Sequence, residues 1–201
     1  MGKYLKKFQT TSQYNAYTAD TANFIKPNVS LITETNTVEY NPYVPPETRV
    51  VAKFNVTSTS TSTKIVGAIT GFSSIEIDGI EQPSVVSAYT FNTTGEHTVK
   101  YTLIDPATIG DNAFYGCSSL TSIAIPDSVT SIGGIDAFYG CTSVSDVYCY
   151  PNPANLTWND DAKDDFKSDG STICHVYSQY LSAYQTKFGN EVNVTFVGDL
   201  T

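Results

Sequence analysis

The chain has two histidines and four cysteines, the side chains most often used as bases, nucleophiles and metal ligands. His175 directly follows Cys174, and a thiol beside an imidazole is the pair that a cysteine nucleophile needs. Neighbours on a strand point to opposite faces, however, so adjacency in sequence keeps these two side chains apart. His97 lies in an alternating apolar and polar run and is expected at a strand surface or edge. We therefore expect neither histidine to form a catalytic pair with a cysteine.

Carboxylates cluster at one place, in the segment that follows Trp158. The cluster consists of Asp160, Asp161, Asp164 and Asp165. Its spacing differs from that of an EF-hand calcium loop, so a solvated acidic helix face is the favoured interpretation. A glycine-rich phosphate loop and an H-E-x-x-H zinc motif are both absent from the sequence. We therefore expect no enzymatic activity, no cofactor and no metal site.

The elements that would position any site are organised around a repeat in residues 109–150. The letters AFYGC at residues 113–117 return unchanged at residues 137–141, 24 positions later. An apolar pattern follows each copy: Leu120, Ile123 and Ile125 return as Val144, Val147 and Cys149. This period with an L-x-x-L-x-L core is typical of a leucine-rich solenoid.

The alternation in the first copy predicts a short strand with one buried side. Ile123 and Ile125 are expected to point inward, and Ser122 and Ala124 outward. Pro126 ends the strand, because proline has no N–H for a ladder hydrogen bond. One coil cannot bury its own apolar side, so the coils must stack and their ends need caps.

These motifs resemble the BspA-like, or Treponema-type, leucine-rich repeats, whose pattern reads I-G-x-x-A-F-x-G-C-x-x-L-x-x-I-x-I-P-x-x-V. Residues 109–129 match that pattern at its fixed positions, and residues 132–141 match its first half. The second copy then departs from the pattern at Val144, Cys149 and Pro151. The resemblance covers about a fifth of the chain and implies a fold more directly than a function.

The resemblance also implies which side chains stack between coils. Phe114 should lie over Phe138, and Cys117 over Cys141, inside a shared apolar column. The cysteine position faces inward in such repeats, so two buried free thiols are favoured over a disulfide. No C-x-x-C spacing points to zinc, and whether Cys149 pairs with Cys174 stays open.

Two modules are predicted before the repeat. Residues 1–46 predict a short helix and then a hairpin formed by residues 28–32 and 37–41. This module loosely resembles leader segments of gut Bacteroidales proteins and their phages, which implies attachment or assembly. Residues 47–104 predict a small immunoglobulin-like β-sandwich of five or six short strands, with a hairpin turn at Asp78-Gly79. The sandwich would cap the first coil.

Residues 105–201 predict the solenoid, with a C-terminal α/β cap from about residue 151. Three aromatic or small residues at helical spacing, Trp158, Ala162 and Phe166, predict one short helix. A strand around residues 173–176, a helix after Ser178 and a strand over residues 192–197 follow. The fold class is thus mainly β: a sandwich, a short solenoid and a cap.

The formal net charge of −9 argues against nucleic acid and anionic membrane surfaces as partners. No apolar run is long enough to predict membrane insertion. Residues 1–8 are basic, but a polar stretch follows where the apolar part of a signal peptide should lie. Either the protein does not use that export route, or a leader has been removed. The localisation is therefore predicted only as cell surface, extracellular or phage virion.

The outward residues of stacked strands form the recognition surface of solenoids. The candidate recognition face here consists of Ser122, Ala124, Asp146, Tyr148 and Tyr150, with residues near Thr172 as an addition. Tyrosine favours binding because it offers a large contact area at low entropic cost. Two coils alone are narrow, so the sandwich or a second subunit of a homo-oligomer would have to widen the surface.

The sequence therefore predicts a non-enzymatic adhesion or recognition protein that binds a protein or glycan ligand, on a bacterial surface or in a phage or prophage particle. Two alternatives stay open. The first is a structural or assembly subunit in which the solenoid is only a scaffold. The second is a carbohydrate-binding module that uses Tyr148, Tyr150 and Trp158.

Overall fold

The computed structural model describes residues 29–31, 38–40, 48–158, 171–189 and 194–201, which belong to two compact units. The first unit spans Met1–Pro45 and the second Pro46–Thr201. In the first, β1 (Val29–Leu31) and β2 (Val38–Tyr40) pair antiparallel, which confirms the predicted hairpin. The helix predicted before them lies outside the described residues.

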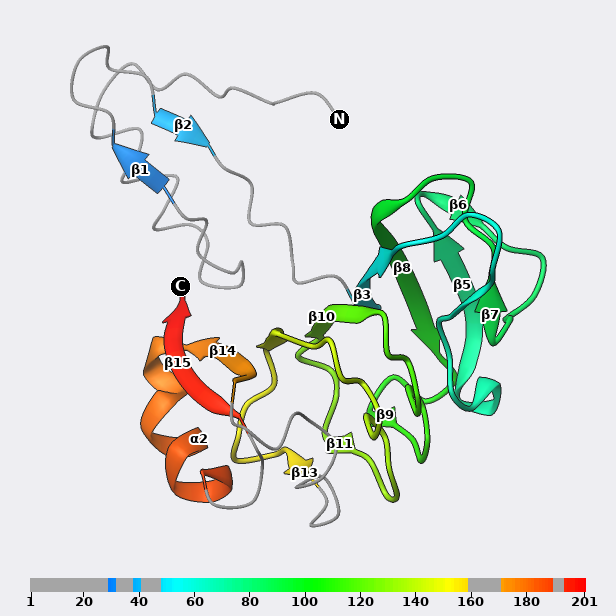
Figure 1. Cartoon of the computed structure of the whole chain (residues 1–201). Coiled ribbons are helices and arrows are strands. Elements are labelled where there is room, and N and C mark those ends of the chain that lie inside the picture. Colours follow the sequence, from blue (N-terminus) through cyan, green and yellow to red (C-terminus); the bar gives the residue numbers. More distant parts are fainter. Residues whose placement is uncertain (1–28, 32–37, 41–47, 159–170, 190–193) are drawn as a thin grey trace. The chain divides into compact units, whose positions relative to one another are not determined.

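The second unit consists mainly of β-strands, with one α-helix among its described residues (Figure 1). Its strands are β3 (Val50–Val56), β4 (Thr63–Lys64), β5 (Phe72–Ile77), β6 (Ile80–Glu81), β7 (Ala88–Tyr89), β8 (Gly95–Leu103), β9 (Thr108–Ile109), β10 (Leu120–Ile125), β11 (Ser131–Ile132), β12 (Asp146–Cys149), β13 (Thr157–Trp158), β14 (Ile173–Tyr177) and β15 (Thr195–Leu200). Its helical segments are η1 (Ile69–Gly71), η3 (Ser178–Tyr180) and α2 (Leu181–Phe188).

An eight-stranded mixed sheet runs through this unit in the order β15-β14-β12-β10-β3-β8-β5-β6. The strands β10, β12, β14 and β15 are parallel, whereas β3, β8, β5 and β6 pair antiparallel with their neighbours. β3 pairs directly with β10, so the first repeat strand is not an edge of the sheet. A parallel three-stranded sheet, β13-β11-β9, is formed by the opposite sides of the coils.

The immunoglobulin-like sandwich and the boundary at residues 104 and 105 stay predictions. Strands from both sides of that boundary lie in one sheet, and β4 and β7 form a separate two-stranded sheet. The buried Tyr101 hydroxyl of β8 donates to the Ile65 carbonyl 2.7 Å away. The predicted turn is confirmed: Asp78 and Gly79 join β5 to β6 with φ of 49° and 83°, as a tight hairpin requires.

The two repeat copies stack in register, as predicted. The rings of Phe114 and Phe138 are fully buried and parallel, with centroids 5.4 Å apart and planes 2° apart. The backbone follows the same spacing, because Phe114 N donates to the Ala137 carbonyl over 2.8 Å. Ile123 and Ile125 are fully buried, so the predicted inward side of β10 is confirmed.

All four cysteines are buried free thiols. Cys141 Sγ lies 3.1 Å from the Phe114 carbonyl oxygen, one coil away, so this thiol is a weak donor inside the column. Burial raises the pKa of Cys117 to about 12, although the nearby charge of Lys64 opposes that shift. A thiol with so high a pKa stays protonated near neutral pH, which agrees with a packing role.

The C-terminal elements differ from the prediction at two points. Trp158 lies in β13 rather than on a helix, because its backbone pairs with Ile132 of β11; the remainder of that predicted helix lies outside the described residues. The final strand, β15, runs over Thr195–Leu200 and so ends three residues later than predicted; residues 192 and 193 of the predicted strand lie outside the described residues. The helix after Ser178 is confirmed as α2, whose buried residues are Tyr184 and Phe188.

Candidate functional site

The outward face of β10 and β12 brings four of the five predicted site residues together. Ser122 lies opposite Asp146, and Ala124 lies opposite Tyr148, in the parallel ladder. All four are half-exposed, since the alternate residues of both strands fill the core. Tyr150 follows β12 and is also half-exposed. Their proximity follows from the register, whereas their role in binding stays a prediction.

Thr172 does not contribute to this face. Its side chain is fully buried, and its Oγ1 donates to the Val144 carbonyl over 3.0 Å. This hydrogen bond therefore connects the residue before β14 to the second repeat copy. The expectation that residues near Thr172 extend the recognition surface is wrong for Thr172 itself.

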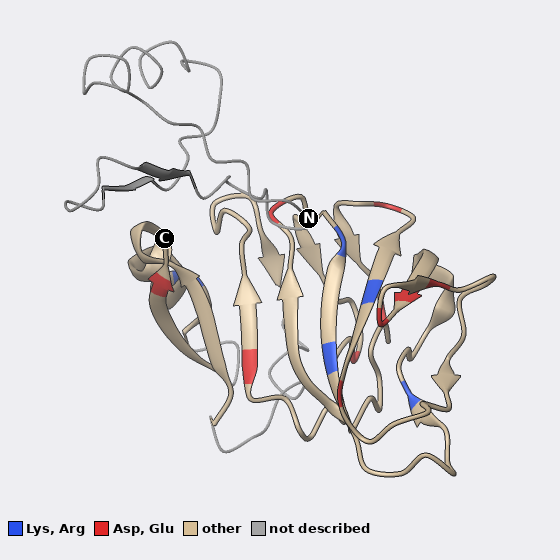
Figure 2. Ribbon diagram, turned by 90° about the horizontal axis from the view of Figure 1, so that it is seen from above, with Lys and Arg blue, Asp and Glu red and all other residues tan. Residues whose placement is uncertain are grey.

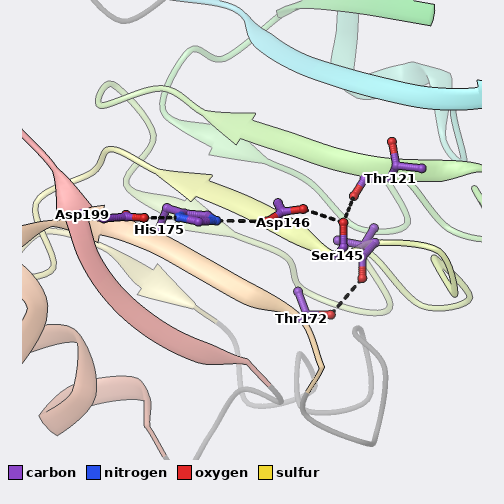
Figure 3. Close-up of polar contacts among 7 residues, drawn as sticks. Thr121, Ser145, Asp146, Thr172, His175 and Asp199 are labelled. Atoms are coloured by element: carbon purple, nitrogen blue, oxygen red, sulfur yellow. Dashed lines mark hydrogen bonds and ion pairs between the residues drawn. The ribbon is translucent and has the colours of Figure 1, made fainter. Parts of the chain in front are cut away.

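The structure adds His175 of β14 to the face, which sequence reasoning considered only as a partner of Cys174. Its Nδ1 lies 2.7 Å from Asp199 Oδ2 and its Nε2 lies 3.1 Å from Asp146 Oδ1 (Figure 3). Its ring stacks on Tyr148, with centroids 4.6 Å apart and planes 12° apart. Three strands, β12, β14 and β15, are thereby joined on their outward side.

The hydrogen bonds continue from Asp146 toward β10. The Ser145 hydroxyl lies 2.5 Å from Asp146 Oδ2 and 3.3 Å from the Thr121 carbonyl oxygen. A hydroxyl carries one hydrogen, so it donates to one of these acceptors at a time. The resulting row of polar contacts runs from Thr121 of β10 past β12 and β14 to Asp199 of β15 (Figure 3).

The charges of this network shift the pKa of its members. The Ser145 hydrogen bond, followed by His175, lowers the pKa of Asp146 against an opposing effect of burial. For His175, burial is the largest single influence and lowers the pKa. The hydrogen bonds and charges of Asp146 and Asp199 together outweigh it, so the pKa of His175 is raised. The network thus favours an imidazolium between two carboxylates.

This arrangement is unsuited to nucleophilic catalysis. Both nitrogens of His175 face carboxylates, and the Ser145 hydroxyl contacts Asp146 rather than the imidazole. Cys174 is buried on the opposite side of β14. Among the described residues, no group of three or more His, Cys, Asp or Glu side chains could hold a metal ion. The described helices also include none that is long and apolar enough to cross a membrane.

Tyrosines border the network on the side of η3. The ring of Tyr177 meets Tyr150 at a centroid distance of 5.8 Å and Tyr180 at 6.1 Å. The ring planes are inclined by 64° and 81°, so these are edge-to-face contacts. Trp158, by contrast, is only 3% exposed and packs edge-on against Phe188, so it is a core residue.

The family described as BspA type leucine rich repeat region (6 copies) matches residues 107–159. This part of the chain is a BspA-type leucine-rich repeat region. The match confirms the predicted resemblance on the segment that carries the two AFYGC copies. Comparison with curated proteins and with solved structures finds no match.

The BspA-type region contains β9 to β13 and all five residues of the candidate recognition face. Four of them lie on β10 and β12, and Tyr150 directly follows β12. His175 and Asp199 come after it, on β14 and β15. The charged network consequently joins the BspA-type region to the chain that follows. A sequence signal for this junction existed only in part: His175 alternates with Cys174 and Val176, which predicts that it points outward.

The network predicts a specific dependence of stability on pH. Because the pKa of His175 is raised by folding, its contribution is complete below the unfolded value of about 6.5 and is lost as pH rises through the folded pKa. Folding lowers the pKa of Asp146, so its stabilising contribution is complete above the unfolded pKa of about 3.9 and is lost as the pH falls through the folded pKa. The network is thus complete between those two unfolded values.

We expect His175→Gln to remove the loss of stability that accompanies deprotonation of His175. In the wild type the free energy of unfolding, measured by urea titration, should fall by about 1 kcal/mol as the pH rises through the folded pKa of His175. His97→Gln leaves His175 in place and should keep the component. An equal pH slope above about pH 6.5 in wild type and His175→Gln would contradict the prediction.

Proposed function

We propose that this chain is a non-enzymatic recognition protein whose outward sheet face binds a protein or glycan ligand. The observation that carries the proposal is the half-exposed surface of Ser122, Ala124, Asp146 and Tyr148 on neighbouring strands of the BspA-type region. The BspA-like resemblance supports adhesion or recognition at a bacterial surface. The phage particle is proposed as the other setting from the loose resemblance of residues 1–46 to leader segments of gut Bacteroidales and phage proteins. In this proposal residues 105–201 act as a short capped solenoid, and residues 47–104 as the sandwich at its start.

The width of the sheet supports a binding role. A stable interface needs roughly 800 Å² on each partner, more than two short strands provide. The same sheet continues on one side through β14 and β15, and on the other through β3 and β8. The six neighbouring strands from β15 to β8 can therefore share one ligand without a second subunit.

The alternative of a carbohydrate-binding module has less support. One of its three proposed aromatic residues, Trp158, is buried against Phe188 and cannot stack on a sugar. A second, Tyr148, already has one ring face against His175. A glycan therefore remains one class of ligand for the proposed face, but a tryptophan-based sugar platform is not part of the proposal.

The test is binding of the full chain to protein and glycan arrays, repeated with Tyr148→Ala. Truncating an aromatic residue at the centre of an interface should weaken binding by about tenfold or more. Tyr139→Ala is the matched control, because that ring is 47% exposed and stacks on Tyr115 away from the face. Unchanged binding by Tyr148→Ala would overturn the proposed face. No ligand on either array, with stable oligomers in light scattering, would favour an assembly subunit.

A further inference from the structure

The part of the face formed by β10, β12, β14 and β15 carries carboxylates but no lysine or arginine. The described residues of β10, β12, β14 and β15 contain two carboxylates, Asp146 and Asp199, and no lysine or arginine. Figure 2 shows where lysine, arginine, aspartate and glutamate lie along the strands of the sheet. Two carboxylates against one imidazolium, His175, leave a net negative charge on this part of the face.

The nearest positive side chains belong to the antiparallel strands and already have partners. Lys53 of β3 lies opposite Ser122, and its Nζ is 2.8 Å from Glu96 Oε1. Arg49 is 3.0 Å from Glu76, to which Lys100 also lies at 3.8 Å. Each of these three side chains is thus paired with a carboxylate other than Asp146 and Asp199.

An aromatic ring stands beside the acidic group. Tyr148 has His175 against one ring face, and the small residue Ala124 lies opposite it on β10. Lys53 of β3 is close enough to interact electrostatically with Tyr148, but its ammonium group is hydrogen-bonded to Glu96. Asp146 precedes Tyr148 by two positions and therefore lies on the same side of β12. Its oxygens contact His175 and Ser145, but a carboxylate has about four lone-pair sites and can accept further donors.

From this geometry we propose that the ligand of the face is a protein segment bearing lysine or arginine, whose aliphatic stem packs over Ala124 against the Tyr148 ring and whose head group reaches Asp146. The proposal rests on the proposed function and names its ligand class. A cation gains from both the ring face and the carboxylate, and the two are adjacent here. The formal charge of −9 also attracts a basic partner over longer distances.

A glycan fits the same surface less well. Sugars stack on open, flat aromatic faces, whereas Tyr150, Tyr177 and Tyr180 meet edge-to-face and form no common plane. The carboxylates that would accept sugar hydroxyls carry a charge that a neutral sugar leaves uncompensated. A basic segment compensates that charge, so the electrostatics favour a protein partner.

The test uses three synthetic peptides in which serine alternates with lysine, glutamine or glutamate, together with a glycan array. We expect the lysine peptide alone to bind the full chain in fluorescence anisotropy, and added salt to weaken it. Asp146→Asn should weaken this binding by about fivefold, the usual scale of one partly exposed charge contact. Asp199→Asn is a second variant that should act in the same direction, so a failure of the first to fold leaves the test intact.

Asp127→Asn is the matched control, because Asp127 is exposed in the turn after β10 and its substitution removes the same charge from the chain. It should leave peptide binding unchanged. An equal loss with Asp127→Asn, or equal binding of the glutamine and lysine peptides, would overturn the basic ligand. If a neutral glycan binds and Tyr148→Ala abolishes that binding, the basic ligand is overturned, but the proposed function stands. Failure of every peptide, protein and glycan to bind would overturn both.

Discussion

Phe138→Ala should lower the free energy of unfolding by about 3–5 kcal/mol, the range for removing a buried aromatic ring. The ring is fully buried and lies parallel to Phe114. Phe114 in turn meets Tyr101 at 5.2 Å and Phe72 at 5.6 Å, both edge-on. The aromatic column therefore extends from the second coil through the first and into β8 and β5. Removing its end leaves a cavity that the neighbouring rings cannot fill without giving up these contacts.

Chemical denaturation followed by circular dichroism measures this loss, and Tyr139→Ala provides the control. Tyr139 is the next residue, is 47% exposed and stacks on Tyr115 with centroids 5.6 Å apart. Because its ring remains in contact with water, its removal should cost about 1 kcal/mol or less. Equal losses from the two substitutions would contradict a buried column. Residues 46–201 form one compact unit, so the wild type should unfold in one transition. Separate unfolding transitions for the repeat and for β3 and β8 would also contradict the column.

The repeat is the part of the fold that the sequence predicts best, because its information is local and occurs twice. The return of AFYGC after 24 positions requires equivalent surroundings for Phe114 and Phe138, and the structure provides them. Alternation likewise assigns Ile123 and Ile125 to the core and Ser122 and Ala124 to the surface. Each of these inferences needs only the period of the chain and not its path.

Pairing between distant strands was not predictable in the same way. The Asp78-Gly79 signal identifies a hairpin correctly, but a turn does not determine which sheet its strands join. The antiparallel pairing of β3 with β10 joins residues about seventy positions apart, and neither strand contains a signal for the other. Trp158 illustrates the opposite error: helical spacing with Ala162 and Phe166 predicted a helix, while pairing with β11 determined the strand.

The charged network was missed for a related reason. Asp146 and its outward direction follow from the repeat, and Tyr148 was included in the face on the same ground. Asp199 lay beyond the predicted end of the last strand, because no period marks where β15 begins or ends. His175 becomes a partner of Asp199 only through the parallel pairing of β14 with β15, which brings together residues 24 positions apart.

Gly67→Ala should be the most damaging substitution outside the repeat. Gly67 N donates to the Ala113 carbonyl over 2.8 Å, and Ala68 N donates to the Asn112 carbonyl over 2.8 Å. A Cβ at position 67 would lie 2.0 Å from the Asn112 carbonyl oxygen and 2.5 Å from Tyr115 N. Both are backbone atoms of the first repeat turn, so no side-chain rotation relieves the overlap. We expect a loss of about 3 kcal/mol or more in the free energy of unfolding.

Gly71→Ala separates this effect from the general cost of replacing glycine. A Cβ at position 71 meets no atom within 4 Å, and its backbone needs no left-handed conformation. Its unfolding free energy, measured by the same denaturant titration, should therefore change by less than about 1 kcal/mol. Similar values for the two variants would contradict a close approach at Gly67. A large loss confined to Gly67→Ala would instead mean that the first repeat turn depends on chain that precedes it, because Gly67 lies forty residues before the matched region begins. The BspA-type region would then fold as a continuation of the preceding strands, and a fragment starting at residue 107 should be less stable than the full chain.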